Sequence, residues 1–362
     1  MKAFMSVDYA HARFLIVQMM HHGDVLLTTA VVDALKHAWP HCTVDMLVYQ
    51  GMDEVLKDNP AIHHIHTIDR AWKKLGWRKH LALELGLAKT IRAAQYDVVL
   101  NYSDRWRTAL LSAYSGAAQR LSFAWNSRDN ALWRSLFHHL PTPSDAKTHM
   151  VEHMLRLPAL LPLPKTDYAA RVQMCVGDSS RAGFQQKLAA QGWQGEDYIL
   201  LHPGSRWFFK CWDDDKTAAL LQKILDSGQN VVLTAAPDER EQKMLHDLQQ
   251  CVHSQQGKLW LLNGILTLRE LAAAIEQAQL FIGVDSVPMH MAAALNKPQI
   301  ALFGASWLGR WRPYSQQATV IWAGDYGELP HPDSIDVQTS PRLLSAIPVE
   351  AVWQAVQQKQ GK

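Results

Sequence analysis

Cysteine is scarce in this chain: there are four among the 362 residues, and they are scattered. Cys42, Cys175, Cys211 and Cys251 form no C-x-x-C pair and have no histidine at a metal-ligand spacing. Disulfide frameworks and structural zinc sites depend on such spacings. The sequence therefore argues against both and favours a reducing compartment.

Long apolar runs are also missing. No stretch reaches the roughly 18 consecutive apolar residues that a membrane-spanning helix needs. The segment Met1–Met20 lacks the ordered cationic, apolar and small-residue regions of a secretion signal. We therefore expect the protein to stay in the cytoplasm.

Charge of one sign does not dominate, since the net charge is +2, but the basic residues are unevenly spread. Residues 70–134 contain 12 Lys and Arg against 4 Asp and Glu, with tryptophans interleaved among them. A basic, aromatic-rich segment suits a polyanionic or membrane-surface partner. The alternative is a set of solvated helix faces with the tryptophans in the core. No nucleic-acid-binding motif accompanies the charge, so we predict no nucleic-acid partner.

Apolar runs of strand length alternate with helical stretches. The first run, Arg13–Met19, precedes a Gly-containing loop, His21–Asp24, and then a helical pattern over Val25–His37. This order is typical of the first βα turn of a nucleotide-binding fold, but G-x-G-x-x-G is absent, so dinucleotide binding is weakly supported. The alternation restarts after a Pro-containing linker, Leu161–Asp167.

The length and the restart predict two domains. Alternating strands and helices predict an α/β fold with two doubly wound parallel sheets. Further strands are expected at Val44–Val48, His64–Ile68, Val98–Leu100, Arg120–Phe123, Tyr198–His202, Val231–Thr234, Lys258–Leu262, Leu280–Val284 and Gln299–Phe303.

The stretch Leu280–Ser306 reads as strand, turn, short helix and strand. Asp285 and Ser286 are good helix N-caps, and Pro288 suits the first turn of a helix. We expect a compact helix over Met289–Leu295 that ends near Asn296 and Pro298. A helix start at the carboxyl end of a parallel strand offers free N–H groups to a phosphate or diphosphate. The alternative is a plain βαβ unit whose caps only close the helix. Beside a diphosphate, a carboxylate at Asp285 suits a cap or an acceptor for sugar hydroxyls.

The segment Thr267–Ile275, followed by Gly283–Ser286, His290 and Ala292–Leu295, resembles the C-terminal signature of glycosyltransferase family 9, the lipopolysaccharide core heptosyltransferases. The chain looks most like the heptosyltransferase III branch of that family. The resemblance implies a GT-B fold of two Rossmann-like domains facing a cleft. We expect an acceptor-binding domain at residues 1–165, a nucleotide-sugar domain at 166–345, and a C-terminal segment, 346–362, whose helix crosses back to the first domain.

The resemblance implies two residues with a direct role in the reaction. Asp24 would be the general base, at the end of the first strand, although it also suits an N-cap for the helix expected from Val25. Lys210 would supply positive charge to the leaving diphosphate, unless it is a surface lysine near a helix start.

The resemblance also implies the donor-binding residues. Ser205 would bind a phosphate. Glu239 would hold the ribose hydroxyls, with the neighbouring Asp238 as the alternative ligand. The run Asp213–Asp215 looks like a metal-binding motif, but its place in the first turn of an expected helix favours a structural role. We therefore expect neither a metal nor a cofactor. The remaining donor contacts are expected at Asp285, Ser286, Val287 and His290, the last of which is alternatively a helix-face histidine.

The acceptor is expected to meet the basic part of the first domain. Arg120, Arg128 and Lys74 are the candidate contacts with an inner-core oligosaccharide, which carries acid sugars and phosphates.

Taken together, the residues and the resemblance predict an inverting, metal-independent transfer of heptose from ADP-L-glycero-D-manno-heptose to the inner-core heptose of lipopolysaccharide. The enzyme would act at the inner face of the inner membrane. Two alternatives stay open: heptosyltransferase I or II or another family 9 sugar transferase, and a non-catalytic nucleotide-sugar-binding protein.

Overall fold

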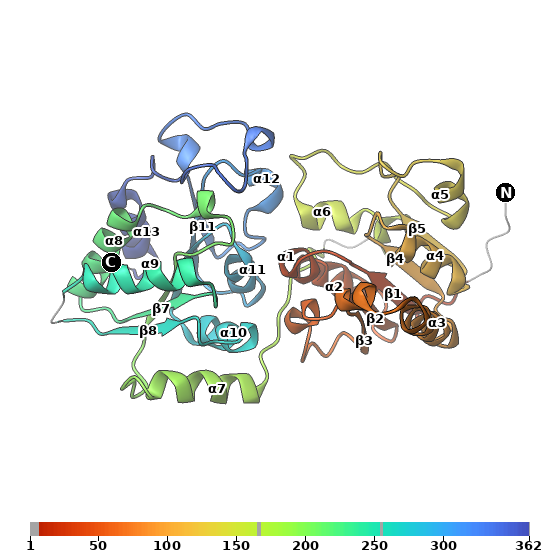
Figure 1. Ribbon diagram of the computed structural model, residues 1–362, viewed down its shortest axis with the longest axis horizontal. Helices are drawn as coiled ribbons and strands as arrows, with labels where there is room; N and C mark the ends of the chain where they lie inside the picture. The colour runs from red at the N-terminus through yellow and green to blue at the C-terminus, as the bar shows by residue number, and fades with distance from the viewer. Residues whose placement is uncertain (1–6, 165–167, 254–255, 362) are drawn as a thin grey trace. The chain divides into compact units, whose positions relative to one another are not determined.

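The computed structural model describes residues 7–164, 168–253 and 256–361. The chain forms two compact units, residues 1–173 and 174–362 (Figure 1). The N-terminal segment 1–6 and part of the expected linker, 165–167, lie outside the described residues. Within the described ranges, no helix is both long and apolar enough to span a bilayer.

The first unit is built on a five-stranded parallel sheet with the order β3-β2-β1-β4-β5. The strands are β1 (Arg13–Val17), β2 (Thr43–Tyr49), β3 (His64–Ile68), β4 (Val98–Asn101) and β5 (Gln119–Ser122). Its α-helices are α1 (His22–Leu27), α2 (Thr29–Ala38), α3 (Trp77–Ala93), α4 (Trp106–Tyr114), α5 (Ala131–Leu136) and α6 (Met150–Leu155).

The second unit is built on a six-stranded parallel sheet with the order β11-β10-β9-β6-β7-β8. Its strands are β6 (Ile199–His202), β7 (Val231–Ala235), β8 (Leu259–Asn263), β9 (Leu280–Val284), β10 (Gln299–Phe303) and β11 (Ala318–Trp322). Its α-helices are α7 (Asp178–Ala189), α8 (Asp214–Asp226), α9 (Glu239–Gln250), α10 (Leu268–Gln277), α11 (Val287–Ala294), α12 (Leu308–Trp311) and α13 (Val349–Lys359).

Both sheets confirm the predicted fold class. In each, the strand order reverses beside the first strand of the unit, as in doubly wound nucleotide-binding domains. The central strands β1, β6, β9 and β10 are almost wholly buried, which explains why they read as continuous apolar runs rather than as alternating ones.

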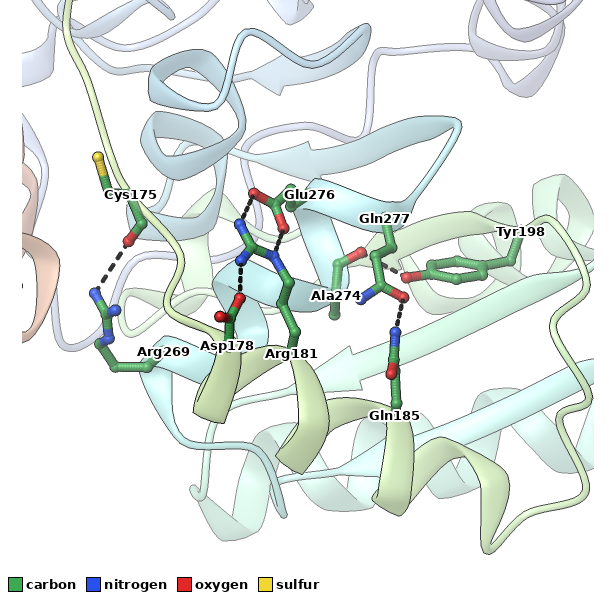
Figure 2. Close-up of polar contacts among 9 residues, drawn as sticks. All are labelled: Cys175, Asp178, Arg181, Gln185, Tyr198, Arg269, Ala274, Glu276 and Gln277. Carbon is green, nitrogen blue, oxygen red and sulfur yellow. Dashed lines mark hydrogen bonds and ion pairs between the residues drawn. The ribbon is translucent and has the colours of Figure 1, made fainter. Parts of the chain in front are cut away.

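Helix α7 packs against α10, and several polar contacts join the two helices (Figure 2). Arg181 forms a two-pronged ion pair with Glu276, through Nε at 2.7 Å and Nη2 at 2.9 Å. Gln185 donates to Gln277. Beside the helix pair, Tyr198, which lies outside α7, donates to the carbonyl of Ala274 in α10. These pairs join positions far apart in the sequence, so the packing of α7 depends on them as well as on its few buried apolar side chains.

The boundary between the units falls at 173/174 rather than at the expected 165/166. Tyr168 and the Gln173 side chain donate to the Asp33 carboxylate of α2, and the Gln173 backbone donates to Thr29. The segment after Tyr168 is therefore fastened to the first unit before the chain leaves it.

The C-terminal helix belongs to the second unit. Helix α13 packs against α8, β10 and β11 of the second unit. Its apolar face, with Val352, Ala355 and Val356, joins the hydrophobic core of that unit. The burial of these three side chains accounts for its position.

Candidate active site

The two sheets place their candidate residues at the points where strand order reverses. In open α/β sheets, ligands bind outside the carboxyl ends of the strands at such points. In the second unit, β6 and β9 are neighbours there, followed by the loop that carries Lys210 and by the turn at Asp285. In the first unit, β1 and β4 are neighbours, and the loop after β1 leads to Asp24.

An ion pair joins the two loops of the second unit. The Nζ atom of Lys210 lies 2.6 Å from Oδ2 of Asp285, and both side chains are largely buried. Ser205 Oγ donates to the Asp285 carbonyl at 3.4 Å. Lys210 thus comes together with two of the expected donor-binding residues, although Asp285 acts as the partner of Lys210 rather than as a helix cap. An ammonium has three donors, so Lys210 has two besides the one that Asp285 holds in position.

Helix α11 begins directly beside this pair. Ser286 is its N-cap residue, but the Ser286 hydroxyl donates to Val284 and accepts no helix N–H. Val287 is the first helical residue, and His290 is buried within the first turn. Since the first N–H groups of a helix have no partner within it, this end suits an anion, with Pro288 contributing no N–H.

The acidic residues at the start of α9 divide into different roles. Asp238 caps the helix, accepting from the N–H groups of Arg240 and Glu241. Glu239, the expected ribose ligand, is exposed in the first turn. Asp238 is thus committed to the backbone, and the carboxylate of Glu239 faces solvent.

Glu241 is a buried carboxylate that sequence reasoning missed. Its Oε2 accepts from the N–H of Ala236 at 3.0 Å and lies 3.9 Å from Nε2 of His202. A Cβ added at Gly204 would lie 2.2 Å from the same oxygen, so any larger residue there would displace the Glu241 carboxylate. Burial raises the pKa of Glu241. The carboxylate therefore fastens α9 to the loop after β7 and lies against Gly204 in the loop after β6.

The loop that carries Lys210 is fastened by a segment near the C-terminus. The N–H of Leu343 donates to the carbonyl of Phe209 at 2.9 Å. The indole of Trp212 donates to the carbonyl of Ile347 at 3.2 Å. The position of Lys210 between Phe209 and Trp212 is thus set partly by residues more than a hundred positions away.

Arg342 of the same segment contacts the loop through its guanidinium. Its Nη1 donates to the Trp212 carbonyl at 2.8 Å, and its Nη2 pairs with Asp214 at 2.8 Å. The guanidinium also lies 4.3 Å from the ring centroid of Phe208, in a cation–π arrangement. The geometry makes Arg342 a positioning residue for the Lys210 loop.

The family resemblance implies that the Lys210 loop contacts the ADP part of the donor. Replacing Arg342 by alanine should then weaken ADP binding about 3- to 10-fold, because this loop loses a charge-assisted hydrogen bond worth on the order of 1 kcal/mol. Isothermal calorimetry measures the change. The matched control is Arg181→Ala, which removes a guanidinium with two carboxylate partners elsewhere in the same unit. Equal ADP affinities in wild type and Arg342→Ala would contradict the positioning role.

Asp24 lies inside helix α1 rather than before it. The helix begins at His22 with His21 as its N-cap residue, so Asp24 occupies the first turn, where it is 9% exposed. Thr28 Oγ1 donates to the Asp24 carbonyl at 2.7 Å and ends α1 where one continuous helix was expected. Asp24 is therefore not the N-cap residue of this helix. Its carboxylate lies in the first turn, where the helix dipole stabilises a negative charge.

The three expected acceptor residues occupy different environments. Arg120 is half-buried and donates to the carbonyls of Leu136 and Ala117, both at 2.8 Å. Arg128 donates to the carbonyl of Asp104 at 3.0 Å. Lys74 is exposed in the last turn of a short 3-10 helix, Arg70–Lys74. Arg120 and Arg128 hold loops of the first unit, whereas Lys74 faces solvent.

The acidic run after the Lys210 loop has local partners. Asp213 precedes α8 and accepts from Ser345, while Asp214 pairs with Arg342. Asp215 is exposed in the first helical turn. In the parts of the chain that the structure describes, no group of three or more His, Cys, Asp or Glu side chains is arranged to hold a metal ion.

Two buried histidines make the stability of the folded protein depend on pH. His66 contacts the Tyr96 hydroxyl at 2.8 Å in the first unit, and His202 contacts Thr234 Oγ1 at 2.9 Å in the second. Burial lowers the pKa of each to about 4. Near neutral pH both rings are therefore uncharged in the folded protein.

The free energy of unfolding should fall as the pH decreases from 6.5 to about 4. In that window the unfolded chain binds protons at these positions and the folded chain does not, which costs roughly 1.4 kcal/mol per pH unit for each histidine. Thermal melting across the window measures the slope, and His66→Gln with His202→Gln should flatten it. An unchanged slope in that double variant would contradict the assignment.

Comparison with known proteins identifies the chain. Residues 85–338 match the family described as glycosyltransferase family 9 (heptosyltransferase). Lipopolysaccharide heptosyltransferase 3 of Escherichia coli is 36% identical over 93% of this chain and 96% of its own.

Two solved structures share the fold. A family 9 glycosyltransferase from Veillonella parvula superposes with a TM-score of 0.81 at 22% identity, covering 98% of each chain. An Escherichia coli heptosyltransferase solved with ADP gives a TM-score of 0.73 at 20% identity, covering 96% of this chain and 99% of that one. Both confirm the GT-B fold. The chain belongs to glycosyltransferase family 9 and is a glycosyltransferase.

Proposed function

We propose that this enzyme transfers heptose from ADP-L-glycero-D-manno-heptose to the inner-core heptose of lipopolysaccharide, as a heptosyltransferase III. The observation that carries the proposal is the 36% identity with Escherichia coli heptosyltransferase 3 over nearly the whole of both chains. The solved heptosyltransferase with ADP supports the nucleotide. The donor residues that we propose are Lys210, Ser205, Glu239 and Asp285, with Ser286, Val287 and His290 at the start of α11.

The proposed reaction is a single displacement. Asp24 takes the proton from the acceptor hydroxyl, the acceptor oxygen bonds to the anomeric carbon, and the bond from that carbon to the diphosphate breaks. One displacement inverts the anomeric configuration. Lys210 and the N–H groups at the start of α11 stabilise the charge that develops on the leaving ADP. The Lys210–Asp285 distance of 2.6 Å supports this role because it holds the ammonium beside the helix start.

The proposed acceptor contacts are Lys74, Arg120 and Arg128 of the first unit. Each carries a positive charge that an anionic core oligosaccharide would require. Lys74 is the exposed member, whereas the other two also hold carbonyls of their own unit. We also propose that the enzyme works in the cytoplasm at the inner face of the inner membrane.

Turnover should survive EDTA. The expectation rests on the helix start and Lys210, which together can stabilise the leaving group without a cation. The measurement is the initial rate with and without chelator. The expectation would be overturned if EDTA abolished activity and magnesium or manganese restored it. The carboxylates of Asp213–Asp215 would then be the candidate metal ligands.

A panel of nucleotide sugars tests the donor. With a heptose-containing core acceptor, ADP-heptose should release free nucleotide at a rate far above that of UDP- or GDP-linked sugars. Preference for another nucleotide or another core acceptor would favour a different family 9 transferase, including heptosyltransferase I or II. Tight ADP-heptose binding with no release under any acceptor would favour the non-catalytic alternative.

A further inference from the structure

Helix α3 of the first unit carries apolar side chains on its outside. Trp77 is 71% exposed, Leu81 49% and Leu85 51%. These residues are spaced four apart, so they lie along one side of the helix. An exposed tryptophan in line with two exposed leucines is unusual for a surface that faces only water.

The same outer surface is basic. Arg78, Lys79 and Lys89 are all exposed on α3. The one acidic residue of the helix, Glu84, is half-buried and pairs with Arg107 of α4 at 2.7 Å. Its charge is thus compensated on the inner side, and the exposed side of α3 carries positive charge only.

The inner side of α3 packs on the first unit. This packing keeps Trp77, Leu81 and Leu85 on the outside. Ile91 is wholly buried in the core of the first unit. Besides the Glu84 pair, Arg92 donates to the carbonyl of Tyr114 in α4. Helix α4 adjoins α3, as Figure 1 shows, and adds exposed apolar side chains of its own, Leu110 and Tyr114.

We propose that the outer face of α3, defined by Trp77, Arg78, Lys79, Leu81, Leu85 and Lys89, is the surface that docks on an anionic lipid bilayer. Apolar side chains enter the boundary of headgroups and acyl chains, while Lys and Arg beside them attract anionic headgroups. A tryptophan at that depth keeps its ring N–H in the polar layer. The charge complementarity with anionic lipid, and the absence of exposed acidic residues on this helix, favour a bilayer over a second copy of the chain.

Cosedimentation with lipid vesicles tests the proposal on the full chain. Wild type should bind vesicles of phosphatidylcholine containing phosphatidylglycerol, bind pure phosphatidylcholine weakly, and lose binding as salt increases. Arg78→Glu/Lys79→Glu/Lys89→Glu and Trp77→Ser/Leu81→Ser should each lower the partition coefficient by at least about tenfold. The matched control is Leu132→Ser on α5, an equally exposed leucine outside this face, which should bind like wild type.

The outcomes separate this inference from the proposed reaction, on whose membrane location it rests. With a water-soluble core oligosaccharide as acceptor, the α3 variants should keep wild-type kcat. The docking proposal would be overturned if wild type did not bind anionic vesicles, or if the α3 variants bound them as wild type does. Neither result would affect the proposed transfer reaction. A wild-type dimer that becomes monomeric in Trp77→Ser/Leu81→Ser would also overturn it and assign the face to a second copy.

Discussion

Replacing Asp24 by asparagine should lower kcat by about 10²- to 10⁴-fold, the usual cost of removing a general base. Asparagine has the same shape and keeps a hydrogen-bonding side chain in the first turn of α1, so the melting temperature should change little. ADP affinity should also change little, because the proposed nucleotide contacts belong to the second unit. Steady-state kinetics, calorimetry and thermal melting on one preparation measure all three.

The matched control for this variant is Asp215→Asn. Asp215 is also an acidic residue in the first turn of a helix, and it is exposed. Its replacement removes the same favourable interaction with a helix dipole without touching the proposed base. If Asp24→Asn keeps most of its kcat, or if both variants lose the same small fraction, Asp24 is a helix-stabilising carboxylate and the base lies elsewhere.

Replacing Lys210 by methionine should weaken ADP binding by about 1.5–3 kcal/mol, or roughly 10- to 150-fold, through loss of a charge-assisted hydrogen bond. The same change leaves the buried carboxylate of Asp285 without its cation, so stability should fall by about 3 kcal/mol. Calorimetry and denaturant unfolding separate the two effects.

The double variant Lys210→Met/Asp285→Asn distinguishes a binding role from a structural one. Removing both charges restores a neutral buried pair, so most of the lost stability should return. ADP affinity should stay low because the ammonium is still missing. An unchanged dissociation constant in Lys210→Met, or full recovery of binding in the double variant, would remove Lys210 from the nucleotide site.

The strands of both sheets were predictable because a buried parallel strand has a short, continuously apolar sequence. Strands β3, β9 and β10 have the predicted bounds, and most of the others differ by one or two residues. Strand β11 was not predicted. It lies at the edge of its sheet and is only partly buried, so its sequence lacks the continuous apolar signal of the central strands.

The contacts between distant positions were not predictable. Helix α7 buries only Ser180, Phe184 and Leu188, and its ion pair between Arg181 and Glu276 joins residues 95 positions apart. Helix α13 likewise packs its apolar face into the core of the second unit through contacts with α8, which lies more than a hundred residues earlier in the chain.

Most residues of the candidate site could be named from the sequence, but the contacts between them could not. The family resemblance implied Lys210 and Ser205, and the expected helix start pointed to Asp285. The neighbouring strands β6 and β9 bring the three together. The ion pair itself was missed because the carboxylate of Asp285 was considered only as a cap or a sugar contact. Glu241 was missed because an acidic residue in the first turn of a helix usually faces solvent, and here it fills the space that Gly204 leaves.

The most direct test of the central claim is heptose transfer by the purified enzyme. ADP-heptose is incubated with a lipopolysaccharide core acceptor that lacks the side-branch heptose, and free ADP and acceptor mass are followed together. Our account predicts one ADP released for each heptose added, with inverted anomeric configuration in the product and no reaction when the acceptor is omitted. ADP release that does not depend on acceptor, or a core acceptor that gains no heptose while the enzyme binds ADP-heptose, would contradict it.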